Sequence, residues 1–194
     1  MPRTVYSKQI AAVMKMPVFG VKDLTGRGVP PAYARQRLHL MSVSERITRI
    51  ERGKYTATGD AVLVASHVTQ PCYLSLWSAL NYRGLTDQIP FSVQVVTSRK
   101  RFARRLSFAG SEIRFYCVRP GMMFGYEQVP YGEGHRIPIA KAEKTIIDAI
   151  YLNGIPLEDL DKAVNSADEA LLTEYSKLTG NRRVIAAVKE LLKC

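Results

Sequence analysis

Residues 31–41, PAYARQRLHLM, and residues 47–55, ITRIERGKY, decide the fold of the amino-terminal part of the chain. Proline is well suited to a first helical turn, and three apolar residues then follow the i, i+4, i+7 spacing of a core-facing helix side, namely Ala34, Leu38 and Met41. The second stretch alternates as a strand pair does, and Arg52-Gly53 suits a tight hairpin tip because glycine accepts positive φ. A helix followed directly by a basic hairpin is typical of a winged helix-turn-helix.

The segments before this stretch complete that pattern. Residues 4–16 and 21–24 are predicted as two helices, and the glycine-rich residues 25–28 as the turn before the third helix. We therefore expect a winged helix-turn-helix domain over residues 1–58 and a second domain over residues 59–194.

Positive charge is concentrated in the first of these domains. Residues 1–58 contain 11 Lys+Arg and 3 Asp+Glu, a net of +8, whereas residues 59–194 contain 17 and 14, a net of +3, and the two add to the +11 of the chain. This asymmetry predicts that the amino-terminal domain binds a polyanion, namely double-stranded DNA.

Side chains for reading DNA are present on the third predicted helix. Arginine can pair bidentately with guanine and glutamine with adenine, and a recognition helix uses its early residues for this. We predict DNA contacts from the helix and from the wing, the latter mainly to phosphates, by Tyr33, Arg35, Gln36, Arg37, His39, Arg49, Arg52 and Lys54. The alternative is an ordinary surface helix with polar residues.

The second domain is predicted to be α+β, with a small sheet and a helical carboxy-terminal tail. Helices are expected at 61–67, 71–81 and 141–152, and strands at 91–97, 113–118, 122–129 and 136–139. The tail is expected to form helices at about 157–164, 168–178 and 182–192, with Asp168 as a helix cap.

A second basic patch lies between two of the expected strands. Residues 99–119 contain 7 basic and 1 acidic side chains, and the cluster at its start consists of Arg99, Lys100, Arg101, Arg104 and Arg105. It could extend the DNA contact, bind RNA or an acidic partner, or be an exposed basic loop.

Catalytic patterns are weak. Paired carboxylates with a lysine are suggested only by Glu112, Glu143, Lys144 and Asp148, for which a helix-surface or capping role is the favoured interpretation. There is no serine nucleophile elbow, Cys–His arrangement or glycine-rich nucleotide loop. We therefore expect a protein that is not an enzyme, with a nuclease as the less favoured alternative. A ligand-sensing transcription factor with a pocket around Trp77 and Tyr126 is a further alternative.

Cofactors, metals and membranes are not indicated. The three cysteines and three histidines are isolated and lack the spacing of metal ligands, which favours reduced thiols in a cytoplasmic protein. No apolar run approaches the roughly 20 residues of a membrane span, and no signal peptide is evident.

Several phrases in the sequence resemble the AbiEi family of antitoxins and transcriptional regulators. They are residues 71–80, PCYLSLWSAL, residues 84–90, GLTDQIP, residues 124–126, FGY, and residues 139–148, IAKAEKTIID, together with the wing residues 52–55, RGKY. The resemblance covers most of residues 5–155, and the tail from Pro156 onwards has no match.

The resemblance implies a two-domain protein with two roles. The winged helix would bind inverted repeats in its own promoter, which favours a homodimer on DNA, and repress the operon. The second domain would counteract a nucleotidyltransferase-like toxin in a type IV system, in which the antitoxin opposes the effect of the toxin without a stable complex. An orphan regulator of the same fold is the alternative.

Overall fold

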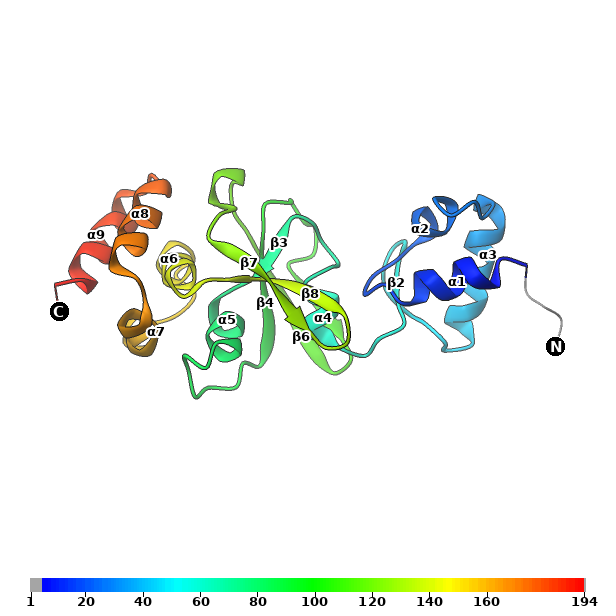
Figure 1. Cartoon of the computed structure of the whole chain (residues 1–194), viewed down its shortest axis with the longest axis horizontal. Helices are drawn as coiled ribbons and strands as arrows, with labels where there is room; N and C mark the ends of the chain where they lie inside the picture. The colour runs from blue at the N-terminus through cyan, green and yellow to red at the C-terminus, as the bar shows by residue number, and fades with distance from the viewer. Residues whose placement is uncertain (1–4, 194) are drawn as a thin grey trace. The chain divides into compact units, whose positions relative to one another are not determined.

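The computed structural model describes residues 5–193 and divides the chain into two compact units, 1–68 and 69–194, which we call the head and the body. The protein is a mixed α+β structure in which a winged helix-turn-helix precedes a sheet and a helical tail (Figure 1). Each unit is described by itself.

The head has the elements that the sequence predicts for it, and in addition α4, which was predicted for the second domain. In chain order they are α1 (Ser7–Met14), α2 (Val21–Thr25), α3 (Pro31–Val43), β1 (Thr48–Glu51), β2 (Lys54–Thr56) and α4 (Ala61–Ala65). Proline occupies the first turn of α3, and the predicted hairpin turns at Arg52-Gly53, where Gly53 has a φ of 77°.

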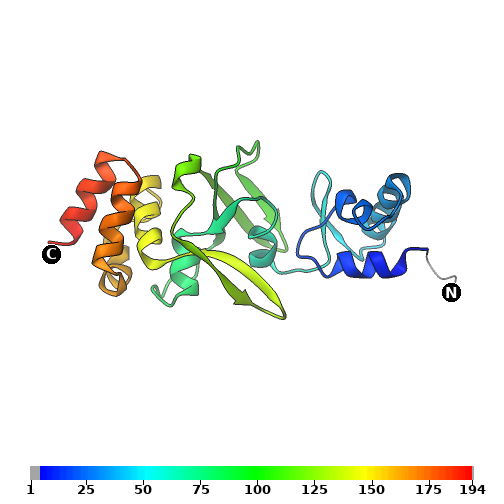
Figure 2. The same cartoon turned by 45° about the horizontal axis from the view of Figure 1, so that its top comes forward.

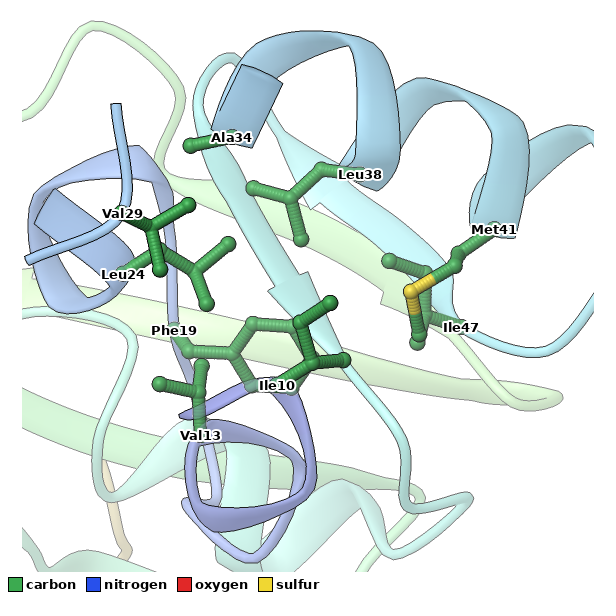
Figure 3. Close-up of a cluster of buried hydrophobic side chains, with 9 residues drawn as sticks. All are labelled: Ile10, Val13, Phe19, Leu24, Val29, Ala34, Leu38, Met41 and Ile47. Atoms are coloured by element: carbon green, nitrogen blue, oxygen red, sulfur yellow. The ribbon is translucent and has the colours of Figure 1, made fainter. Parts of the chain in front are cut away.

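One apolar cluster holds α1, α2 and α3 of the head together. The predicted inner face of α3, Ala34, Leu38 and Met41, is almost completely buried. Figure 3 shows these side chains pointing toward residues from α1, α2 and the connecting segments, namely Ile10, Val13, Phe19, Leu24, Val29 and Ile47. Burial of this apolar surface is the main term that stabilises the helix-turn-helix.

The hairpin is attached to the helices by a short backbone bridge. The Phe19 amide donates to the Tyr55 carbonyl at 2.9 Å, and the Tyr55 amide donates to the Phe19 carbonyl at 2.8 Å. Next to this bridge, the backbone of Gly20 approaches that of Gly53 so closely that a Cβ on Gly20 would lie 2.3 Å from the Gly53 carbonyl oxygen. The wing is therefore anchored at its tip and at its second strand.

The boundary between the units lies further along the chain than residue 58. Helix α4, predicted at 61–67, groups with the head, which ends at Val68. Its amino terminus is capped by Asp60, whose carboxylate accepts from the amides of Val62 and Leu63 at 2.8 and 2.9 Å. Lys54 of the wing also donates to the Val68 carbonyl, which ties this segment to the hairpin.

The body is built on a six-stranded mixed sheet in the order β5-β6-β4-β3-β8-β7. The strands are β3 (Cys72–Leu74), β4 (Ser92–Thr97), β5 (Arg105–Phe108), β6 (Ser111–Cys117), β7 (Tyr126–Tyr131) and β8 (His135–Ala140). The pairs β4–β6 and β3–β8 are parallel, and the other neighbours are antiparallel.

Helices form two further layers beyond the sheet. The helices α5 (Leu76–Tyr82) and α6 (Ala142–Leu152) contact the sheet, and the tail packs on α6 (Figures 1 and 2). The tail consists of a 3₁₀ helix (Leu157–Leu160), α7 (Asp161–Ser166), α8 (Glu169–Leu178) and α9 (Arg182–Leu191), which confirms its predicted helices. Asp168 caps α8 as predicted, accepting from the Leu171 amide at 2.9 Å.

Two predictions for the sheet region are wrong. The segment 71–81 is not one helix: residues 72–74 form the central strand β3, and α5 begins only at Leu76. A continuous apolar run has no periodicity that separates a buried strand from a buried helix. The strand predicted at 122–129 is displaced to β7, because a 3₁₀ turn (Pro120–Met122) and Gly125, with a φ of 70°, precede it. Strand β5 was not predicted.

Candidate nucleic-acid interface

Helix α3 presents a polar, basic outer side. Its residues Arg35, Gln36 and His39 are exposed, on the side opposite to the buried residues of the head core. Arg35 and His39 are separated by four positions and therefore lie one above the other along the helix. The structure thus leaves these three predicted contact residues accessible to a ligand.

Arg37 lies on the flank of α3. It is half-buried, and its Nε atom is shielded from solvent without a hydrogen-bond acceptor among residues 5–193. A buried donor without an acceptor costs free energy. Of the predicted contacts on α3, Arg37 is therefore the one with a buried guanidinium N–H group that lacks an acceptor within residues 5–193.

Tyr33, one of the predicted DNA contacts, is instead half-buried and packs against the head core. Its ring packs edge-on against Tyr6 with the ring centroids 5.4 Å apart, and its hydroxyl donates to the Val5 carbonyl at 3.0 Å. A helical projection of α3 places Tyr33 on the exposed side. Its large aromatic ring nevertheless packs at the edge of the head core, because burial of the ring is favourable. Tyr33 thus joins α3 to the start of α1.

The wing provides two free basic side chains rather than three. Arg49 on β1 and Arg52 at the hairpin tip are exposed. Lys54, predicted as a third contact, has its Nζ 2.7 Å from a Glu51 carboxylate oxygen and also donates to the Val68 carbonyl. An ammonium with two internal acceptors stabilises the hairpin and has less capacity for a phosphate.

Few carboxylates oppose the basic groups of the head. The Glu51 carboxylate forms an ion pair with Lys54. The Asp23 carboxylate accepts from the Gly20 amide at 2.7 Å at the start of α2. Within residues 5–193, no salt bridge joins Arg35, Arg49 or Arg52 to an acidic side chain. Their charge is therefore available to an external polyanion.

The second basic patch, Arg99, Lys100, Arg101, Arg104 and Arg105, belongs to the body, and its members differ in their contacts. Arg99 donates from Nε to the Gln70 carbonyl at 3.0 Å. Arg101 lies 4.0 Å above the centre of the Phe115 ring and donates to Thr69. These two arginines brace the loop. Arg101 is half-buried, whereas Arg99, Lys100, Arg104 and Arg105 are exposed.

The carboxylate set considered for catalysis is divided between two places. Glu112 lies on β6, where it contacts Arg114 and has one oxygen 3.7 Å from an Nη atom of Arg105. Lys144 and Asp148 are instead fully buried on α6 and form an ion pair of 2.5 Å. Asp148 also accepts from the Tyr73 and Ser75 hydroxyls, at 3.0 and 2.8 Å.

A surface role for these α6 residues is therefore wrong. Glu143 is buried as well and accepts from the Asp168 amide at 3.0 Å, which links α6 to the start of α8. The tail packs on the side of α6 that an isolated helix would leave to solvent. Burial lowers the pKa of Lys144 and raises that of Asp148, each opposed by the charge of its partner.

Three other kinds of feature bear on function: metal clusters, membrane-spanning helices and aromatic pockets. Within residues 5–193, no group of three or more His, Cys, Asp or Glu side chains could hold a metal ion. In the same range, the structure has no helix that is both long and apolar enough to cross a membrane. The sequence also suggested a pocket around Trp77 and Tyr126. Trp77 lines a cavity with Gln94 and Arg114, but Tyr126 is not part of its lining and stacks on Tyr73, with the ring centroids 4.7 Å apart.

The sequence does not predict the hydroxyl partners of Asp148 or the strand β5. The hydroxyl partners of Asp148 lie 73 and 75 positions away in the chain, so no local pattern indicates them. Strand β5 places Arg105 opposite Arg114 of β6. The short alternation of residues 105–108 could have indicated this strand, but the basic residues before it favoured a loop.

Comparisons with known proteins give information on the fold. No protein-family model matches the chain, and no curated protein sequence does. The structure is similar to the crystal structure of the RV2827C protein from Mycobacterium tuberculosis, with a TM-score of 0.60 and 14% sequence identity. The match covers 97% of this chain and 76% of that chain. At this level of identity, the likeness is one of fold.

Proposed function

We propose that the protein binds double-stranded DNA through its head and regulates transcription of its own operon. The exposed, unpaired Arg35, Arg49 and Arg52 on α3 and the wing carry this proposal, since they belong to a folded helix-turn-helix with an anchored hairpin. Gln36 supplies a side chain that can recognise adenine. The alternative of an ordinary polar helix leaves the excess charge of the head without a role.

The proposed contacts divide into two classes. Gln36 and Arg35 on the exposed side of α3 would reach base edges, and Arg49 and Arg52 would contact phosphates. Phosphate neutralisation releases counterions, so the two phosphate contacts from the wing would contribute about −1.8 to the slope of log K against log salt. Inverted repeats in the promoter would engage two copies of the protein.

A gel-shift titration of the full-length protein on its own upstream region tests this proposal. We expect tight binding that prefers this region to scrambled DNA and weakens steeply with salt. Gln36→Ala should lower the preference by about 5- to 150-fold, which corresponds to about 1–3 kcal/mol for one bidentate pair. Arg52→Ala should weaken binding to all sequences and reduce the salt slope by about one.

Arg182→Ala provides the matched control. Arg182 is exposed on α9 in the body, so this variant removes the same charge without altering the head. If Arg182→Ala weakens DNA binding as much as Arg52→Ala does, net charge rather than the head interface determines binding. If neither Gln36→Ala nor Arg52→Ala has an effect, α3 and the wing are not the DNA-binding surface.

We further propose an antitoxin role for the body, directed against a nucleotidyltransferase-like toxin. This part rests on the AbiEi-like phrases at residues 71–80, 84–90 and 139–148. Co-expression with a toxin encoded in the same operon should restore growth, and Gln36→Ala should retain this ability because its change lies in the head. Failure of the wild-type protein to restore growth would leave a DNA-binding regulator without an antitoxin role.

A further inference from the structure

The body carries a groove, formed by two neighbouring cavities over β4 and β6, that the proposed DNA-binding role does not use. The first cavity, of about 410 Å³, is lined by Arg104, Arg105 and Arg114. The second, of about 260 Å³, is lined by Trp77, Phe91 and Gln94. Arg114 and Tyr116 line both cavities, which therefore lie side by side. We call the pair the arginine–aromatic groove.

One end of the groove has uncompensated positive charge. Arg105 and Arg114 are direct cross-strand neighbours, and a like-charged pair in that position is destabilising. Glu112 contacts both, so the guanidinium groups of Arg105 and Arg114 share one carboxylate. The exposed Arg104 has no side-chain acceptor among residues 5–193. An anion seated here would offset the repulsion and use the open donors, and guanidinium groups suit a phosphate particularly well.

The other end offers flat apolar surfaces and amide groups. Phe91 is completely exposed, and Trp77 and Tyr116 are half-buried along the same cavity. Gln94 is held in place, because its side-chain oxygen accepts from the Trp77 amide at 2.9 Å and its nitrogen lies 3.5 Å from the Tyr116 hydroxyl. Aromatic side chains in this setting are typical platforms for stacked bases.

From this combination, we propose that the arginine–aromatic groove binds a nucleoside phosphate, with the phosphate at Arg104, Arg105 and Arg114 and the base at Trp77, Phe91 and Tyr116. The ligand is either a free mononucleotide or a nucleotide within a single strand. An acidic peptide would satisfy the arginines but would leave the aromatic end without a partner. A base and its phosphate satisfy both ends.

The fluorescence of Trp77 offers a local measurement, since it is the only tryptophan of the 194 residues. Full-length protein is titrated separately with AMP, adenosine, inorganic phosphate, single-stranded oligoadenylate and a polyglutamate peptide. We expect saturable quenching by AMP or by oligoadenylate, with much weaker effects of adenosine and of phosphate alone. Quenching by AMP assigns the site to free nucleotides, and quenching by oligoadenylate alone assigns it to a strand.

Variants then test the two ends of the groove. Arg104→Ala should weaken binding of the active probe about tenfold or more, because a charged hydrogen bond is lost. Tyr116→Ala should have a similar effect and Tyr116→Phe a much smaller one, since the phenyl ring still stacks. The control Arg182→Ala should bind as the wild type does, and thermal unfolding verifies that each variant is folded.

Three results would overturn the proposal: no response to AMP or oligoadenylate, equal effects of Arg104→Ala and Arg182→Ala, or stronger binding of polyglutamate than of either nucleotide probe. The inference is independent of DNA binding by the head. A Gln36→Ala variant should keep its full Trp77 response, so loss of operator binding and loss of nucleotide binding are distinguishable.

Discussion

Lys144 and Asp148 show how neighbouring side chains make a buried ion pair tolerable. Both are fully inaccessible, and removal of two charges from water is costly unless their hydrogen-bonding capacity is met. The Tyr73 and Ser75 hydroxyls donate hydrogen bonds to the Asp148 carboxylate, while the Lys144 ammonium lies 4.5 Å from the centre of the Phe124 ring. The positions of these partners depend on the sheet, so the sequence of α6 alone predicted a surface role.

Removal of only one partner of this pair should be strongly destabilising. We expect Lys144→Met to lower the free energy of unfolding by about 3–5 kcal/mol, because Asp148 is left charged and unpaired. The double variant Lys144→Met with Asp148→Leu should recover a large part of this loss. Denaturant titration followed by Trp77 fluorescence measures both. Equal instability of the single and double variants would contradict the assignment.

Cys72 and Cys117 should differ sharply in reactivity. Cys72 is buried on β3, and burial raises the pKa of its thiol to about 12, whereas Cys117 is exposed. In a Cys194→Ser background at pH 8, we expect an aromatic disulfide reagent to label one thiol in the native protein and a second only on unfolding. Fast labelling of both native thiols would show that β3 is accessible.

The raised pKa of Cys72 also predicts an alkaline loss of stability. Between pH 9 and pH 12, the unfolded thiol loses its proton while the native thiol keeps it. The free energy of unfolding therefore falls as the pH rises through this window. Cys72→Ala should show a smaller fall than the wild type in denaturant titrations at pH 8 and pH 10. An equal fall in both would assign the alkaline loss to other groups.

At the scale of elements, amphipathic helices were predicted well and the sheet less well. The periodicity of α3 placed Ala34, Leu38 and Met41 in the core, and the exposure of Arg35, Gln36 and His39 follows from the same periodicity. Strand β3 is buried on both faces and paired with β4 and β8, so its identity depends on partners that are remote in sequence. The arginine–aromatic groove likewise could not be predicted from the sequence, because its lining residues come from segments that are remote in the chain.

The wing depends on the close approach of Gly20 and Gly53. A Cβ at Gly20 would lie 2.3 Å from a backbone oxygen, which cannot move without opening the hairpin. We expect Gly20→Ala to destabilise the head by at least about 1–3 kcal/mol and to weaken DNA binding through the displaced wing. Gly59→Ala is the matched control, because a Cβ there meets no atom within 4 Å. Circular dichroism melts should show a loss for Gly20→Ala only, and unchanged melting of this variant would contradict the proposed packing.

At the scale of the whole molecule, the chain combines two units with separate cores. The charge asymmetry in the sequence indicated this division, although α4 moved the boundary from residue 58 to Val68. The contacts that attach α4 to the hairpin, such as that of Lys54 with the Val68 carbonyl, have no signal in hydrophobic periodicity. The antitoxin role proposed for the body and the DNA-binding role proposed for the head are thus assigned to different cores.

Separate cores predict separate unfolding transitions. A unit with its own hydrophobic core can unfold without the other, and Trp77 lies in the body, so its fluorescence reports on that unit alone. Gly20→Ala should therefore shift the transition seen by circular dichroism and leave the Trp77 transition unchanged, whereas Lys144→Met should shift the Trp77 transition. If Gly20→Ala moves both signals together, the two units unfold as one cooperative structure, and DNA binding by the head would then be energetically coupled to the stability of the body.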